Sequence, residues 1–166
     1  MLAGEAALPA LYKALASDDP EVRRRAGRIV TAIESRLYPE LRLAGYRGPV
    51  LSVCLSADGK RLLSASYDAT VRVWDVESGK ELKRIQAHKQ HAYRAAFSPD
   101  GKRIVSGGDD GAVRVWDTQS GKELRKYGGH NVARDTNYKD VVFFPDGKRI
   151  ACTSCDGTTR IWRAPR

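Results

Sequence analysis

Three copies of one sequence, each carrying a tryptophan at the same place, occupy most of the chain. The middle copy spans residues 92–130, an earlier copy spans 50–88, and a later copy spans 141–166. Their tryptophans, Trp74, Trp116 and Trp162, are separated by 42 and 46 residues. A repeat of this length predicts one supersecondary unit per copy, which buries its apolar face against the next copy.

Turn residues divide the middle copy into four short segments. The apolar residues 95–97 are followed by Pro99 and Gly101, which favour a tight turn. The other strands are expected at 103–106, 112–116 and 123–127, with turns at 109–111 and 117–121 between them. Alternation of Val113 and Val115 with Ala112, Arg114 and Trp116 predicts a sheet with two differently used faces. The sequence therefore predicts a four-stranded antiparallel sheet for each copy.

The period, the Gly129-His130 pair and the Trp116-Asp117 pair together resemble the WD-repeat family. The resemblance implies a mainly β fold with three four-stranded antiparallel propeller blades, which is a partial propeller, preceded by an α-helical hairpin. We expect the hairpin in residues 1–40 and the blades in residues 41–166.

The resemblance also implies a structural hydrogen-bond network in each copy, which ties a turn to the tryptophan. In the first copy Tyr46 replaces the histidine of this network, and in the third copy a cysteine replaces the serine. The implied members are His88, Ser106, Asp110 and Trp116 in the middle copy, His130, Cys152, Asp156 and Trp162 in the last, and Ser64, Asp68 and Trp74 in the first.

The first 40 residues show helical rather than strand periodicity. Apolar residues recur every three or four positions in 5–16 and again in 21–37, which predicts two amphipathic helices. Asp19 followed by Pro20 is a typical helix start. The pair resembles a single HEAT repeat. We interpret the basic cluster Arg23 to Arg25 as a solvated helix face, with nucleic-acid or lipid binding as the alternative.

Three blades are fewer than the four to eight of a closed propeller. Residues 41–46 align with a fourth strand and are available to complete the last blade. We therefore expect either a fragment of a longer array or a partial propeller that self-associates through its edge strands.

The favoured function is a non-catalytic protein–protein interaction scaffold, and the alternative is a regulatory or sensing appendage of a larger multidomain protein. The predicted protein-binding face combines turn residues with an inter-blade loop at 131–139, which is four residues longer than its counterpart. Its members are Tyr67, Asp109, Cys155, Arg134, Tyr138 and Lys139.

Other functions find less support in the sequence. His88, Ser106 and Asp110 are the residue types of a hydrolase triad, but no nucleophile-elbow context accompanies them. Cys152 and Cys155 have CxxC spacing without a second ligand pair, so we expect no metal or other cofactor. The net charge of +9 comes mostly from Gly-Lys turns of the repeats, and a nucleic-acid partner is not expected. Three cysteines and the lack of long apolar runs favour a cytoplasmic protein with no membrane association.

Overall fold

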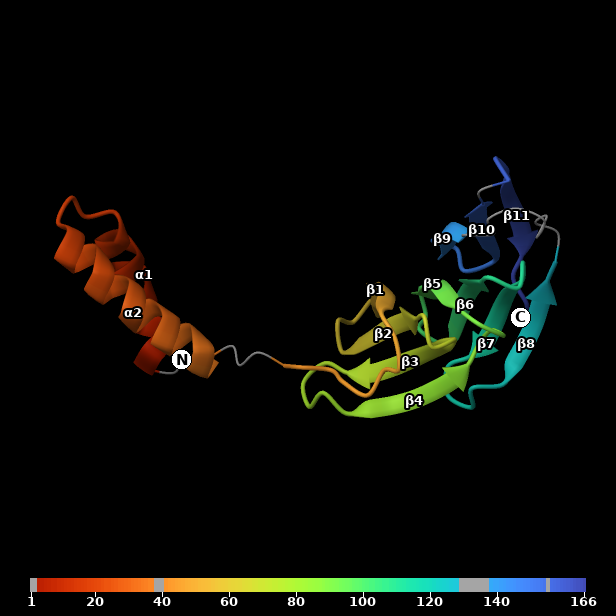
Figure 1. Cartoon of the computed structure of the whole chain (residues 1–166), viewed down its shortest axis with the longest axis horizontal. Helices are drawn as coiled ribbons and strands as arrows, with labels where there is room; N and C mark the ends of the chain where they lie inside the picture. Colours follow the sequence, from red (N-terminus) through yellow and green to blue (C-terminus); the bar gives the residue numbers. More distant parts are fainter. Residues whose placement is uncertain (1–2, 38–40, 129–137, 155) are drawn as a thin grey trace. The chain divides into compact units, whose positions relative to one another are not determined.

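The computed structural model describes the backbone of residues 3–37, 41–128, 138–154 and 156–166, and the side chains of these residues except 3–8, 34–37, 138 and 139. The chain divides into two compact units, Met1–Arg42 and Leu43–Arg166. The first unit is helical and the second consists of strands (Figure 1).

The helical unit contains α1 (Ala3–Leu15) and α2 (Pro20–Leu37), which confirms the predicted hairpin. The Asp19 carboxylate accepts hydrogen bonds from the backbone amides of Glu21 (2.8 Å) and Val22 (3.4 Å), and so caps α2. Arg24 and Arg25 both pair with Glu21. These two arginines therefore lie on an exposed face where their charge is partly balanced.

The strands form three antiparallel sheets, which we call blades 1, 2 and 3. Blade 1 contains β1 (Val50–Leu55), β2 (Arg61–Ser66), β3 (Thr70–Asp75) and β4 (Glu81–Gln86). Blade 2 contains β5 (Ala92–Phe97), β6 (Arg103–Gly108), β7 (Val113–Asp117) and β8 (Glu123–Tyr127). Blade 3 contains β9 (Tyr138–Phe143), β10 (Arg149–Ser154) and β11 (Thr159–Arg163).

The prediction of WD-type blades is confirmed, with one difference in blade 3. Among the described residues this sheet has three strands rather than four. Residues 41–46 are not assigned to a strand, and the Tyr46 hydroxyl lies 2.6 Å from Ser64 Oγ of blade 1. The segment that aligns with a fourth strand is thus held at the opposite end of the array from blade 3.

Consecutive blades pack face to face. β5 contacts β1 and β2, and β9 contacts β5 and β6 (Figure 1). One apolar cluster joins blades 1 and 2, and a second joins blades 2 and 3. The first cluster includes Leu63, Val71, Val73, Phe97, Ile104 and Trp116, and the second includes Val105, Val113, Val115, Val141 and Ile150. Blade 2 therefore contributes one face to each of two interfaces, whereas blades 1 and 3 each contribute one face to one interface.

The first turn of each blade is closed by an aspartate. In blade 2 the Asp100 carboxylate accepts hydrogen bonds from Ser98 Oγ (2.5 Å) and the Lys102 amide (3.1 Å). Asp58 makes the same two contacts in blade 1. This side-chain bonding is the reason that the Asp-Gly-Lys sequence recurs at one end of the blades.

Candidate protein-binding face

A buried hydrogen-bond network in blade 2 joins four side chains. The Trp116 indole Nε1–H donates to Ser106 Oγ at 2.9 Å. His88 Nε2 lies 2.9 Å from the same hydroxyl, and His88 Nδ1 lies 3.0 Å from Asp110 Oδ1. Trp116, Ser106 and His88 are buried. The structure therefore brings together the four residues that the resemblance implied for this copy.

Arginine is a further member of the network that sequence reasoning missed. Arg114 Nη2 lies 2.6 Å from Asp110 Oδ2, and Arg114 Nη1 lies 2.7 Å from His88 Nδ1. In blade 1, Arg72 Nη2 lies 2.7 Å from Asp68 Oδ2. An arginine stands two residues before each tryptophan and four residues after each turn aspartate, and this spacing was the available signal.

Blade 1 builds the same network with tyrosine in place of histidine. The Tyr46 hydroxyl lies 2.6 Å from Ser64 Oγ, which also accepts the Trp74 indole N–H at 3.0 Å. The Arg72 guanidinium lies 4.2 Å from the centre of the Tyr46 ring, a cation–π distance. Tyrosine therefore keeps the hydrogen bond to the serine. The Asp68 carboxylate instead pairs with the Arg72 guanidinium and accepts a hydrogen bond from the Arg47 amide.

Blade 3 keeps Asp156 and Trp162 at the equivalent positions, with Cys152 replacing the serine. Asp156 Oδ1 accepts hydrogen bonds from the Thr158 amide (2.9 Å) and hydroxyl (2.6 Å). Burial raises the pKa of the Cys152 thiol to about 12, so the thiol is neutral near pH 7. The Trp162 ring packs against Tyr127 with the ring centres 5.5 Å apart. His130 lies outside the described residues.

The networks of blades 1 and 2 lie next to exposed loops that form one surface. Tyr67 is exposed, and its ring stacks on His91 with ring centres 3.5 Å apart. His91 Nδ1 donates a hydrogen bond to the Tyr67 carbonyl at 2.8 Å, and the Asp109 amide donates to the His91 carbonyl at 3.2 Å. The centre of the Tyr93 ring lies 5.9 Å from the centre of the His91 ring. We call Tyr67, His91, Tyr93 and Asp109 the aromatic face.

A glycine allows the loop to approach the network this closely. A Cβ atom at Gly108 would overlap the His88 ring and lie 2.6 Å from the His91 carbonyl oxygen. Ser66 occupies the equivalent place in blade 1, where residue 46 is tyrosine. The close contact with His88 and His91 therefore explains why residue 108 has no side chain.

The predicted binding residues are placed as follows. Tyr67 and Asp109 both belong to the aromatic face. Arg134 and Cys155 lie outside the described residues, and Tyr138 and Lys139 belong to β9 by their backbone, without described side chains. His91 and Tyr93 were missed, although they begin blade 2 directly after an inter-blade loop, where binding residues often lie.

Comparison with known proteins gives the family. The repeat described as WD domain, G-beta repeat matches residues 38–75, 79–117 and 121–163, which together make up more than half of the chain. The chain belongs to the WD40-repeat family. The solved structure of U3-55K superposes on 73% of this chain and 38% of that one, with a TM-score of 0.66 and 28% identity.

Relatives resemble shorter stretches of the WD40 blades. The chain is 41% identical over 49 residues to dynein assembly factor with WD repeat domains 1 of Mus musculus, covering 30% of this chain and 12% of that protein. It is 38% identical over 71 residues to small ribosomal subunit protein RACK1 of Drosophila melanogaster, covering 37% and 22%. The chain thus matches less than a quarter of the length of either protein.

Neither a metal-binding cluster nor a membrane-spanning helix is found among the described residues. In that part of the chain, no three His, Cys, Asp or Glu side chains are grouped closely enough to hold a metal ion. None of the helices in the described ranges has the length and apolar content required to span a membrane.

The buried aspartates of the WD40 networks have altered acidity. Burial alone would raise the pKa of Asp110, but hydrogen bonds from His88 and Arg114 outweigh it and hold this pKa well below its usual value. For Asp68, burial is again outweighed, here by hydrogen bonds from Thr70, Arg47 and Ser66, and its pKa falls to about 2. Both carboxylates are therefore ionised over the whole physiological range.

Replacing Ser106 with alanine is expected to lower the free energy of unfolding by about 1–3 kcal/mol, because the buried groups of Trp116 and His88 both lose a partner. Urea denaturation measures the change. Ser120→Ala, at an exposed turn serine, is the matched control and should change stability by less than about 0.5 kcal/mol. Equal effects of the two substitutions would contradict the structural role of Ser106.

Asp110→Asn is expected to change the pH dependence of stability. A carboxyl with a depressed folded-state pKa stabilises the fold above its unfolded pKa of about 3.9 and loses this contribution as the pH falls below it. The stability difference between wild type and Asp110→Asn should be largest at pH 5–7 and shrink below pH 4. Urea denaturation from pH 2 to 7 tests this, with Glu77→Gln at an exposed turn as the control. A difference that is constant with pH would refute the assignment.

Proposed function

We propose that this WD40-repeat chain is a non-catalytic protein–protein interaction scaffold, which binds a partner through the aromatic face of blades 1 and 2. The observation that carries the proposal is the stack of the exposed Tyr67 ring on the half-buried His91 ring, next to the half-buried Tyr93. Tyrosines provide large contact areas and are enriched among the residues that dominate binding energies at protein interfaces.

The aromatic face is held in place before any partner binds. The Tyr67 amide donates to the Pro49 carbonyl at 2.9 Å, and the Tyr67 carbonyl accepts from His91. Stacking restricts the Tyr67 ring further. Because these groups are already ordered, binding through them costs less conformational entropy than binding through mobile side chains.

The geometry of the candidate triad supports a scaffold rather than a hydrolase. Ser106 is fully buried, and its hydroxyl is engaged by Trp116 and His88. A nucleophilic serine must be exposed to substrate and have an oxyanion hole beside it. The Ser–His–Asp geometry is used here to hold the turn beneath the aromatic face.

The names of the relatives also fit this proposal. They include a dynein assembly factor and the general transcriptional corepressor TUP1 of Saccharomyces cerevisiae, which is 41% identical over 44 residues and matched over 6% of its length. We extend the proposed binding surface to Arg134, Tyr138, Lys139 and Cys155, because in the sequence they belong to the inter-blade loop before the third repeat or to the turn position equivalent to Tyr67 and Asp109.

A second candidate function is that of a regulatory or sensing appendage of a larger multidomain protein. It is favoured by the helical unit, in which Val22 and Ile29 of α2 are exposed. A HEAT-like hairpin ordinarily covers such residues with a neighbouring repeat. In this case α2, rather than the aromatic face, would make the decisive contact.

Tyr67→Ala combined with Tyr93→Ala is expected to reduce partner recovery at least tenfold, which corresponds to about 1.4 kcal/mol of binding free energy. The measurement is affinity capture with the full chain, quantified by mass spectrometry against wild type. Val76→Ala, at an exposed apolar residue of the turn after β3, is the matched control and should leave recovery unchanged.

Equal recovery by wild type and the double tyrosine variant would refute binding through the aromatic face. If recovery is instead lost with Val22→Glu and Ile29→Glu, the contact lies on α2 and the appendage function is correct. Arg134→Ala with Tyr138→Ala tests whether the third blade contributes to the same surface.

A further inference from the structure

The two ends of the blade array expose apolar side chains. At one end, Val53 and Leu55 of β1 are 63% and 57% exposed, and we call this surface the leading face. At the other end, Val142 of β9 and Ile161 of β11 are 43% and 57% exposed, and we call this surface the trailing face. Apolar residues gathered in this way on sheet faces indicate a surface that a partner covers.

The same repeat positions are buried where two blades meet inside the chain. Ala95 and Phe97, which correspond to Val53 and Leu55, are only 6% and 8% exposed. Val73 and Val115, which correspond to Ile161, are 2% and 0% exposed. Every junction inside the chain thus packs the trailing face of one blade on the leading face of the next.

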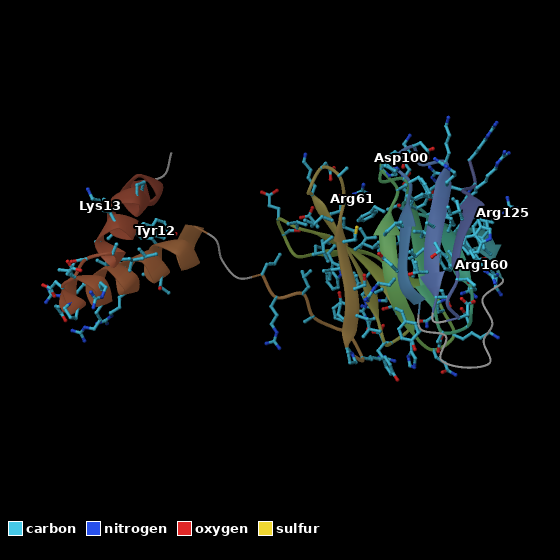
Figure 2. All side chains as sticks on the ribbon, turned by 90° about the horizontal axis from the view of Figure 1, so that it is seen from above. Tyr12, Lys13, Arg61, Asp100, Arg125 and Arg160 are labelled. Carbon is cyan, nitrogen blue, oxygen red and sulfur yellow. The ribbon has the colours of Figure 1, made fainter. Side chains whose placement is uncertain are left out.

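An arginine spans each internal junction. Arg61, at the start of β2, donates to the Gly101 carbonyl of blade 2 at 3.2 Å, and it lies near Asp100 at the same end of the sheets (Figure 2). Arg103, at the start of β6, donates to the Gly147 carbonyl of blade 3 at 2.9 Å. These guanidinium groups also lie 5.2 Å and 5.4 Å from the ring centres of Phe97 and Phe143.

The two partners of this contact, an arginine and a glycine carbonyl, also occur at the two ends of the blade array, where they are far apart. Arg149, the counterpart of Arg61 and Arg103, contacts residues of its own blade within the described ranges: its guanidinium lies 3.3 Å from the Asp146 carboxylate and 4.2 Å from the centre of the Phe144 ring. Gly59 is the counterpart of Gly101 and Gly147. A Cβ atom built on Gly101 or on Gly147 would lie within 4 Å of an arginine side chain of the preceding blade. A Cβ atom built on Gly59 would have no atom of the described residues within 4 Å, its two chain neighbours left aside.

We propose that a second copy of this chain covers both faces. The trailing face of each copy packs on the leading face of the other, and Arg149 of one copy donates to the Gly59 carbonyl of the other. Two such junctions close a ring of six blades, which lies within the range of four to eight found in propellers. Leu55 stands where Phe97 and Phe143 stand, so the new junctions bury an aliphatic side chain under the guanidinium.

The segment before blade 1 fits the same arrangement. His88 follows β4 of blade 1 and bonds to Ser106 of blade 2, and Tyr46 bonds in the same way to Ser64 of blade 1. Leu43 therefore has the repeat position of Ile85 and Tyr127, which pair with Val71 and Val113. In the ring, Leu43 of one copy would pair with Thr159 of the other and extend its three-stranded sheet.

Light scattering of the full chain on a sizing column tests the proposal. The expected mass is twice 18.3 kDa. Leu55→Glu and Ile161→Glu should each reduce it to that of a single chain, because a buried unpaired charge would disrupt both junctions. Val76→Glu places the same charge in an exposed turn away from both faces and should leave the doubled mass unchanged.

Mixing the two variants separates this head-to-tail contact from other contacts. One junction of the mixed pair combines the unaltered trailing face of Leu55→Glu with the unaltered leading face of Ile161→Glu, so the doubled mass should return. A single-chain mass for wild type at all concentrations, larger polymers, a dimer insensitive to both variants, or failure of the mixture to reassociate would each overturn the proposal. Circular dichroism establishes that all variants remain folded.

Discussion

The hydrogen bond from a tryptophan indole to a buried serine hydroxyl is the contact on which each of the first two blades depends. Trp116 on β7 reaches Ser106 on β6, and Trp74 on β3 reaches Ser64 on β2. The same serine hydroxyl is also hydrogen-bonded to a residue of the segment that precedes the blade, which is His88 for Ser106 and Tyr46 for Ser64. One hydroxyl therefore connects two strands of a blade with the segment that precedes it.

Charge makes this network costly to leave incomplete. Arg72 is almost fully buried, and its guanidinium contacts Asp68, Glu81, Thr70 and the Gly45 carbonyl. Removing one partner of a buried ion pair leaves an uncompensated charge, which destabilises a fold far more than loss of a surface pair. The networks fix the turns within blades, and the arginines at the starts of β2 and β6 join one blade to the next. The aromatic face lies next to the networks within the blades. The proposed ring repeats the arginine contact between blades at two further junctions.

The period of the sequence was sufficient to predict the blades, because tight turns require Gly, Pro and Asp at fixed places. The helix start at Asp19 and Pro20 was readable for a similar reason. The roles of Arg72 and Arg114 were not, because strand alternation assigns a residue to a face without saying which charge it meets. Nor did the sequence indicate that the guanidinium groups of Arg61 and Arg103 bridge neighbouring blades. The stacking of Tyr67 on His91 depends on two loops that are 24 residues apart in sequence, which no local pattern reports.

Hydrogen exchange of the indole N–H groups, followed by NMR, tests the central role of the network most directly. If the network opens only when blade 2 unfolds, the free energy of exchange at the Trp116 indole should equal the global free energy of unfolding obtained from urea denaturation. The Trp74 indole should exchange equally slowly. Exchange of the Trp116 indole at the rate of an exposed indole, while the β6 backbone amides remain protected, would contradict the account.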